Sequence, residues 1–276
     1  MSIYKEMTLV EQKQVMLEIL QAFAGYCDTH NLTYYLDAGT LIGAVRHRGY
    51  IPWDDDIDVN MPQEDYYKFV RQMRELNGCL SENIRVEFSD ETLYSFLKIS
   101  DSRTVMIEFP EQNPMEVAVY IDVFPKFGIK DKSWKSKLVC NICEILSLWQ
   151  WFNVYTIKKW KRPEKKTFQR FLGKTLDLIN FSPHLPQKIQ EWFMLLYAKR
   201  HPLSQCQYVT TLTNGEFHKL SPKECFDGFQ WLDFEGLKFK GPKDYDTYLH
   251  CLYKGDYMQL PPENKRVHHI TKVYWK

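Results

Sequence analysis

The chain has 276 residues, which is enough for one large domain or two small ones with a substantial core. Its formal net charge is +1, so no overall field favours nucleic acid, and we expect no nucleic-acid partner. The 7 cysteines are odd in number and scattered, which does not suit a disulfide framework, and the N-terminus lacks an apolar leader. No stretch reaches the ~18 apolar residues of a membrane-spanning helix, so the simplest expectation is a cytoplasmic protein.

The first half of the chain predicts helices that alternate with strands. Thr8 and Glu11 fit a capping box, and the apolar spacing that follows predicts a helix over 9–29. Next we expect a strand over 32–36, a short helix over 41–45, a strand over 56–61 and a helix from 62 to 76. Further strands are predicted over 84–88, 94–99, 104–107 and 119–124, the last of them ended by Pro125.

From residue 134 onward the pattern becomes mostly helical. Helices are predicted over 134–158, 167–180 and 187–200, and a hairpin with strands over 231–234 and 237–239. A short helix to Tyr253 and a basic tail complete the chain. We therefore expect an α/β part over 1–128 and a mostly helical part over 129–276.

The most informative stretch of the sequence is the run 52–59, which reads PWDDDIDV. Four aspartates in five positions repel one another unless a cation lies against them, and Mg²⁺ prefers carboxylate oxygens. Asp56 and Asp58 alternate with Ile57 and Val59. On a strand, both carboxylates would therefore face one side and both apolar side chains the other.

Other interpretations of the acidic run have to be weighed against a metal site. An acidic surface turn accounts for Asp54 and Asp55 but not for the alternation after them. A calcium-binding EF-hand loop needs glycine at its sixth position, where this chain has Val59. The Asp-x-Asp motif of nucleotide-sugar glycosyltransferases, which also holds a metal against a diphosphate, remains open.

Residues outside the run add a phosphate site and a third acid. Gly39 and Thr40 open a helix directly after a strand, and the backbone N–H groups and dipole at such a start favour phosphate. Asp122 lies between two apolar residues of a predicted strand, where a lone buried carboxylate would be costly. We therefore expect Asp122 to be a further metal ligand beside Asp56 and Asp58.

Two segments resemble a known family. The run 35–59, YLDAGTLIGAVRHRGYIPWDDDIDV, resembles the signature of the LicD family, which comprises phosphocholine transferases of bacterial surface glycans and is similar to the fukutin-related ribitol-phosphate transferases. The tail 253–267 resembles the C-terminal end of the family. There the family usually reads Tyr-Gly-Asp, whereas this chain has Lys254 before Gly255. The two segments bracket the chain.

The resemblance implies a nucleotidyltransferase-type α/β (α+β) fold, a mixed sheet flanked by helices. Residues 1–128 would form the catalytic core, and residues 129–276 would complete the site. It also implies a metal-dependent enzyme that moves phosphocholine from CDP-choline to a sugar hydroxyl of a lipid-linked or polymeric glycan of teichoic acid or lipopolysaccharide type, releasing CMP. Asp56, Asp58 and Asp122 would bind one or two Mg²⁺ ions, for which Mn²⁺ could substitute, and Asp122 would help to draw off the acceptor proton.

Basic residues are the expected partners of the donor. Each of them could instead be a solvated charge, but positive groups beside a diphosphate stabilise the leaving group. Together with the predicted phosphate site at Gly39 and Thr40, the candidates for donor binding are Arg46, His47, Lys98, Arg103, Arg266 and His268. Choline itself is recognised by aromatic faces, and Trp53 is the ring nearest to the acidic run.

Two questions of partner and function stay open. Residues 138–157 are rich in large apolar side chains and precede a lysine- and arginine-rich run, which suits either a buried helix or a peripheral membrane contact through 138–166 at the inner face of the membrane. The alternatives to a phosphocholine transferase are a transferase of another nucleotide-activated phospho-alcohol, a glycosyltransferase, and a non-catalytic nucleotide-binding module.

Overall fold

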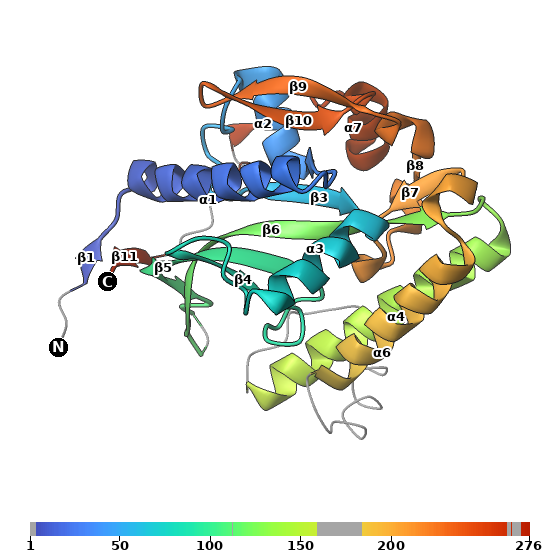
Figure 1. Ribbon diagram of the computed structural model, residues 1–276, viewed down its shortest axis with the longest axis horizontal. Helices are drawn as coiled ribbons and strands as arrows, with labels where there is room; N and C mark the ends of the chain where they lie inside the picture. The colour runs from blue at the N-terminus through green and yellow to red at the C-terminus, as the bar shows by residue number, and fades with distance from the viewer. Residues whose placement is uncertain (1–3, 112, 159–183, 264–265, 267–271) are drawn as a thin grey trace.

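The computed structural model describes residues 4–111, 113–158, 184–263, 266 and 272–276, and within them the fold is a β-sheet with helices on both sides (Figure 1). The strands are β1 (Lys5–Glu6), β2 (Tyr35–Leu36), β3 (Asp58–Pro62), β4 (Ile84–Glu87), β5 (Leu97–Glu108), β6 (Met115–Ile129), β7 (Tyr208–Thr210), β8 (Ser221–Pro222), β9 (Phe229–Phe234), β10 (Leu237–Pro242) and β11 (Lys272–Trp275). The helices are α1 (Leu9–Thr29), α2 (Ala38–His47), α3 (Gln63–Glu75), α4 (Trp134–Ile157), α6 (His184–Arg200) and α7 (Tyr245–Tyr253).

The main sheet is mixed and has nine strands among these residues. Its order is β1-β11-β5-β6-β3-β2; β4 also pairs with β5, and β7 pairs with β6 and β8. β3 and β6 are parallel, whereas β5 is antiparallel to β6. The predicted mixed α/β fold is confirmed.

α1 and α3 cover one face of this sheet. The capping box predicted for α1 is present, because the Thr8 side chain accepts from the Glu11 N–H and the Glu11 carboxylate accepts from the Thr8 N–H at 2.8 Å. Apolar side chains of both helices pack with those of β3, β5 and β6 in one core. The other face of the sheet carries Lys98 and Asp122, together with aromatic side chains such as Tyr94 and Tyr120.

Two predictions for the central strands were wrong. The segments 94–99 and 104–107 were expected to be separate strands, but both contribute to β5, which has an irregularity between Asp101 and Met106. Pro125 does not end β6. Successive backbone nitrogens of a strand point to opposite edges, and the Asp122 N–H points to the β3 side. The nitrogen of Pro125, three positions later, therefore points to the β5 side. The pairing with β5 does not extend beyond Val123, so no N–H donor is needed there.

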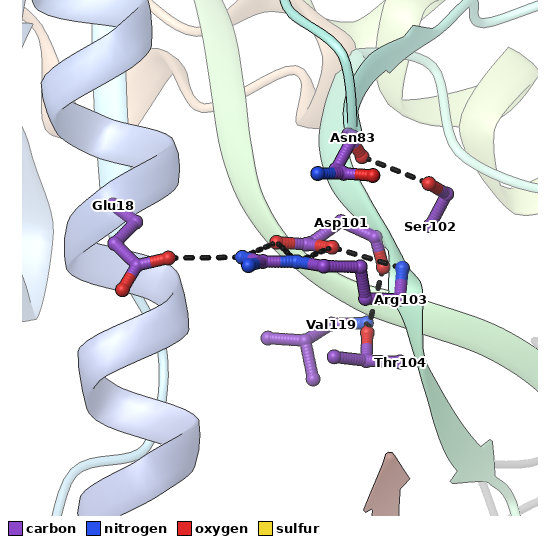
Figure 2. A network of polar contacts seen from close by, with 7 residues as sticks. All are labelled: Glu18, Asn83, Asp101, Ser102, Arg103, Thr104 and Val119. Carbon is purple, nitrogen blue, oxygen red and sulfur yellow. Dashed lines mark hydrogen bonds and ion pairs between the residues drawn. The ribbon is translucent and has the colours of Figure 1, made fainter. Parts of the chain in front are cut away.

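A polar network fixes the irregularity in β5 (Figure 2). Asp101 is fully buried and accepts hydrogen bonds from the Arg103 N–H at 2.9 Å and from its guanidinium at 2.5–3.1 Å. The same guanidinium pairs with Glu18 of α1 at 2.9 Å. The Thr104 hydroxyl donates to the Asp101 carbonyl and accepts from the Val119 N–H, both at 2.8 Å. The network therefore joins α1 to both central strands.

The second half of the chain adds a helical pair and a hairpin. α4 and α6 run antiparallel and share a second core with the end of β6. The helix predicted over 167–180 lies outside the described residues. The hairpin β9–β10 turns at Glu235 and Gly236, which both have positive φ, and the Glu235 carboxylate accepts from the Tyr50 N–H at 3.0 Å.

The C-terminal strand returns to the sheet, where β11 pairs with both β1 and β5, so the two termini lie close together (Figure 1). β1, β7, β8 and β11 were not predicted. The division of the chain at residue 128 stays a prediction.

We expect Arg103→Met to lower the free energy of unfolding by about 2 kcal/mol, because it leaves the buried Asp101 carboxylate without its charged partner. The control is Glu18→Gln, which breaks only the more exposed end of the network and should cost less than about 1 kcal/mol. Urea denaturation of the two variants measures both values. Equal losses would contradict this account of the network.

Candidate active site

Two of the predicted metal ligands lie opposite each other on neighbouring strands. Asp58 on β3 is the register partner of Asp122 on β6, so both carboxylates project from the face that α1 and α3 leave open. Ile57 and Val59 are buried in the core on the other side, as the alternation predicted. Asp56 lies two residues before β3, in an extended segment whose Ile57 carbonyl accepts from the Asp122 N–H at 2.9 Å.

Cavities flank the acidic segment on two sides. A cavity of about 530 Å³ is bounded by the start of α2, by Asp56 and Asp58, and by tail residues between 253 and 261. A smaller one of about 160 Å³ is lined by Asp56, Asp122 and side chains of α1. Asp56 therefore borders both spaces, and the first half of the chain and the tail together enclose the larger one.

The start of α2 is fitted closely to the acids. The Thr40 hydroxyl accepts a hydrogen bond from the Asp58 N–H at 2.8 Å. A Cβ at Gly39 would lie 2.6 Å from Oδ2 of Asp54, so only glycine lets this carboxylate approach the helix. An acidic oxygen thus already lies against the N-terminus of α2, where phosphate is expected.

Asp37 caps α2 within a buried charged network. One oxygen accepts from the Ala38 N–H at 2.8 Å and from the Tyr248 hydroxyl, and the other pairs with Lys126 Nζ at 3.0 Å. The Asp37 N–H donates to the Asp58 carbonyl at 2.9 Å. Burial acts to raise the pKa of Asp37, but the Lys126 charge and these hydrogen bonds hold the pKa below its usual value.

This network joins several elements around the site. Lys126 comes from the end of β6, Tyr248 from α7 and Asp37 from the end of β2, and all three are buried. Ala38 has φ +43°, which is unfavourable for a residue with a Cβ and must be imposed by its surroundings. The network is therefore what holds the first turn of α2 against β3.

Lys98 contacts the acidic residue Asp122 and does not line the cavity of about 530 Å³. It is only 3% exposed, its Nζ lies 2.9 Å from Oδ1 of Asp122, and the two residues are register partners across β5 and β6. Its ammonium also lies 3.2 Å from the ring centre of Tyr120 and 4.1 Å from that of Tyr94. This geometry gives Lys98 a contact with Asp122, while its expected contact with the donor stays a prediction.

Arg46 lines the large cavity, and its guanidinium donates to the Tyr257 carbonyl at 2.7 Å and to His47 at 2.9 Å. Burial and the neighbouring Arg46 charge lower the pKa of His47. Arg266 lies over the Trp53 ring at 4.5 Å, at the edge of the same region. Arg46 is thus the basic candidate that the structure places on the cavity wall.

Arg103, another basic candidate, is not brought to this cavity. Arg103 is engaged by Asp101 and Glu18 and does not line it. His268 lies outside the described residues. The expected donor contacts of both stay predictions.

Negative charge accumulates on the open face of the sheet. Burial raises the pKa of Asp58 well above its usual value, and the nearby charges of Asp56, Asp122, Asp37 and Asp54 raise it further. Burial also raises the pKa of Asp122, against the opposing effect of Lys98. The buried lysines Lys98 and Lys126 pair with Asp122 and Asp37, but the acids outnumber them among the described residues, so the face favours an additional cation.

The residues present are chemically suited to Mg²⁺, which remains a prediction. In the part of the chain that the structure describes, no three His, Cys, Asp or Glu side chains are grouped as a ready metal site. Carboxylate oxygens of Asp56, Asp58 and Asp122 are nevertheless the ligand type that Mg²⁺ prefers. The side-chain amide of Asn60, two residues after Asp58, is buried and has no hydrogen-bond partner among the described residues. A bound water or ion would supply such a partner.

Sequence analysis missed Lys126, Tyr248 and the capping role of Asp37. Asp37 does precede a predicted helix, where Asp is a preferred N-cap, so that signal was available. Lys254, the residue at which the tail departs from the family pattern, is the left-handed C-cap of α7 with φ +53°. The neighbouring tail residues still line the large cavity.

Comparisons with known proteins agree with this arrangement. A family model described as LicD/FKTN/FKRP, nucleotidyltransferase domain, matches residues 31–142, which include α2, β3 and β6. The ribitol 5-phosphate transferases FKRP of human and mouse are each 25% identical over 119 residues, or 43% of this chain and 22% of theirs.

A further relative is similar from end to end. The lipopolysaccharide cholinephosphotransferase LicD of Haemophilus influenzae is 33% identical over 286 aligned positions, which cover 98% of this chain and 99% of the relative. The similarity therefore includes the tail and α7 as well as the acidic segment. On this evidence of sequence and geometry, the chain belongs to the LicD family.

Proposed function

We propose that this protein transfers phosphocholine from CDP-choline to a hydroxyl of a cell-surface glycan precursor, of lipopolysaccharide or teichoic acid type, and releases CMP. Membership of the LicD family makes it a phosphotransferase. The observation that supports the proposal most is the register pair Asp58 and Asp122, beside the N-terminus of α2, in a chain that matches a cholinephosphotransferase over its whole length.

The donor is best accommodated in the cavity of about 530 Å³. The first turn of α2 at Gly39 would receive the diphosphate, and Arg46 would offset the charge that develops on CMP. Trp53, Tyr253 and Tyr257 also line this cavity, together with Asp256. Aromatic faces with a carboxylate are what a trimethylammonium group needs.

The transfer is a substitution at the phosphorus that carries choline. The acceptor oxygen forms a new P–O bond while the P–O bond to CMP breaks, and CMP leaves with that electron pair. Asp122 uses Oδ1 for Lys98, so we assign Oδ2 to the acceptor hydroxyl, whose proton it would receive. A divalent ion bound by Asp56, Asp58 and Asp122 would neutralise charge on the transferring group.

A second donor class follows from the human and mouse relatives, whose names describe transfer of ribitol 5-phosphate. Their similarity covers only 43% of this chain, so it does not distinguish one activated phospho-alcohol from another. A glycosyltransferase would instead leave a nucleoside diphosphate, and a binding module would release nothing.

A donor panel is expected to identify CDP-choline. The purified protein with Mg²⁺ and a glycan acceptor should release CMP from CDP-choline at least about tenfold faster than from CDP-ribitol, because a sugar alcohol offers no cation to the aromatic rings. Release of UDP or GDP from nucleotide sugars would show a glycosyltransferase instead. Nucleotide chromatography measures all of these products, and a chelator should stop CMP release until Mg²⁺ is restored.

Asp58→Asn and Asp122→Asn should each lower kcat by about a hundredfold or more, because each removes a charge that the reaction needs. The melting temperature of Asp58→Asn should not fall, since this change relieves repulsion among neighbouring acids. Asp122→Asn should lower it, because the buried Lys98 loses its charged partner. The control is Asp90→Asn, an acid paired with Arg74 at the surface away from the site, which should retain the native rate. Native turnover by Asp58→Asn would refute the assignment.

Lys126→Met should lower both stability and activity, although Lys126 lies behind the cavity wall. Loss of the ammonium leaves the buried Asp37 carboxylate without its charged partner, at a cost of about 3 kcal/mol, and frees the first turn of α2. Adding Asp37→Asn to Lys126→Met should recover part of the melting temperature. Lys130→Met, an exposed lysine beyond the end of β6, is the matched control and should change neither property.

A further inference from the structure

The helical pair α4–α6 lies on the part of the molecule away from α1 and the hairpin (Figure 1), and it exposes large apolar side chains. Trp134 on α4 is 70% exposed and Trp192 on α6 is 63% exposed. Leu138 and Ile145 follow Trp134 at intervals that keep them on one side of α4, and Leu195 follows Trp192 on α6. An exposed apolar surface of this kind indicates a binding partner.

A groove runs between the start of α4 and the end of α6. It has a volume of about 570 Å³, and Trp134, Phe193 and Tyr197 form much of its apolar wall. Its rim is basic, with Lys130, Lys135 and Arg200. The acid in the lining, Asp131, already accepts hydrogen bonds from Ser133 and Ser136.

The described residues of this region carry an excess of positive charge. In 130–158 and 184–201 the cations are Lys130, Lys132, Lys135, Lys137, Lys158, Lys188, Lys199 and Arg200, against the acids Asp131, Glu144 and Glu191. The whole chain has a net charge of only +1, so this excess is local. The partner should therefore be both apolar and anionic.

We propose that the α4–α6 face, defined by Trp134, Leu138, Trp192 and Leu195 with Lys130, Lys135, Lys199 and Arg200, binds an anionic membrane surface. Indole rings favour the boundary between headgroups and acyl chains, and the lysine and arginine side chains reach lipid phosphates. The charge of the face complements such a surface, and none of the described helices is long and apolar enough to cross a membrane. The contact would be peripheral.

This proposal differs from the contact expected over 138–166 from the sequence. Residues 159–166 lie outside the described part, and the exposed tryptophans and the groove place the contact at the start of α4 and the end of α6. It also goes beyond the transfer reaction, because lipid binding requires neither donor nor acceptor.

Vesicle flotation tests the proposal directly. The full-length protein at low salt should float with vesicles of phosphatidylcholine mixed with phosphatidylglycerol and remain largely unbound with phosphatidylcholine alone. Lys135→Glu/Arg200→Glu should weaken binding by about tenfold or more, since each cation near the surface contributes to the attraction. Trp134→Ser/Trp192→Ser should weaken it in the same measure by removing the apolar part.

The controls are Trp231→Ser and Lys238→Glu on the hairpin, where Trp231 is 49% exposed, and both should bind like the wild type. Phosphocholine transfer to a soluble acceptor should be unchanged in all these variants, so loss of lipid binding and loss of catalysis are measured separately.

Three results would overturn the proposal. Failure of the wild type to float with anionic vesicles is the first, and equal loss of binding in the hairpin controls is the second. The third is dimer formation by the wild type, measured by light scattering, that Trp134→Ser/Trp192→Ser abolishes without affecting vesicle binding. In that case the face is an interface between copies of the chain.

Discussion

The buried contact between Asp37 and Lys126 is the interaction on which the geometry of the site depends. It fixes the first residue of α2 against the end of β6, and the Asp37 N–H joins the same point to the carbonyl of Asp58. Tyr248 extends the contact to α7, whose C-terminal end leads into the cavity wall. Two charges buried together are costly to assemble, but separating them is costlier still. The pair therefore specifies one position for the start of α2, the predicted phosphate site, relative to the acids.

Four aspartates of the sheet and its adjoining turns form two groups, which differ in their positively charged partners. Asp37 and Asp101 are buried beside a lysine or an arginine, and each stabilises a turn of the backbone. Asp58 and Asp122 project instead onto the open face, where the only buried ammonium within contact of Asp122 among the described residues is that of Lys98. The raised pKa values of Asp58 and Asp122 express this imbalance. Acids with pKa values perturbed in this way, gathered beside a cavity, are typical of a site that binds a ligand.

The sequence predicted what depends on local pattern. The alternation of Asp58 with buried Ile57 and Val59, the capping box of α1 and the helix that begins next to Gly39 all follow from neighbouring residues. The pairing of Asp37 with Lys126 and Tyr248 could not be predicted, because residues distant in the chain meet only in the folded sheet. Pro125 was misjudged for a related reason, since its effect depends on which edge of β6 lacks a neighbour. β11 is four residues long and can be recognised as a strand only from its pairing with β1 and β5.

The tail from Tyr253 to Pro261 closes a space whose acids Asp54, Asp56 and Asp58 are supplied by the first half of the chain. The acids and α2 are synthesised long before this wall. A nascent chain thus contains the acidic residues without an enclosed substrate compartment. Removal of the segment after α7 would therefore open this cavity while leaving the acids of the first half in place.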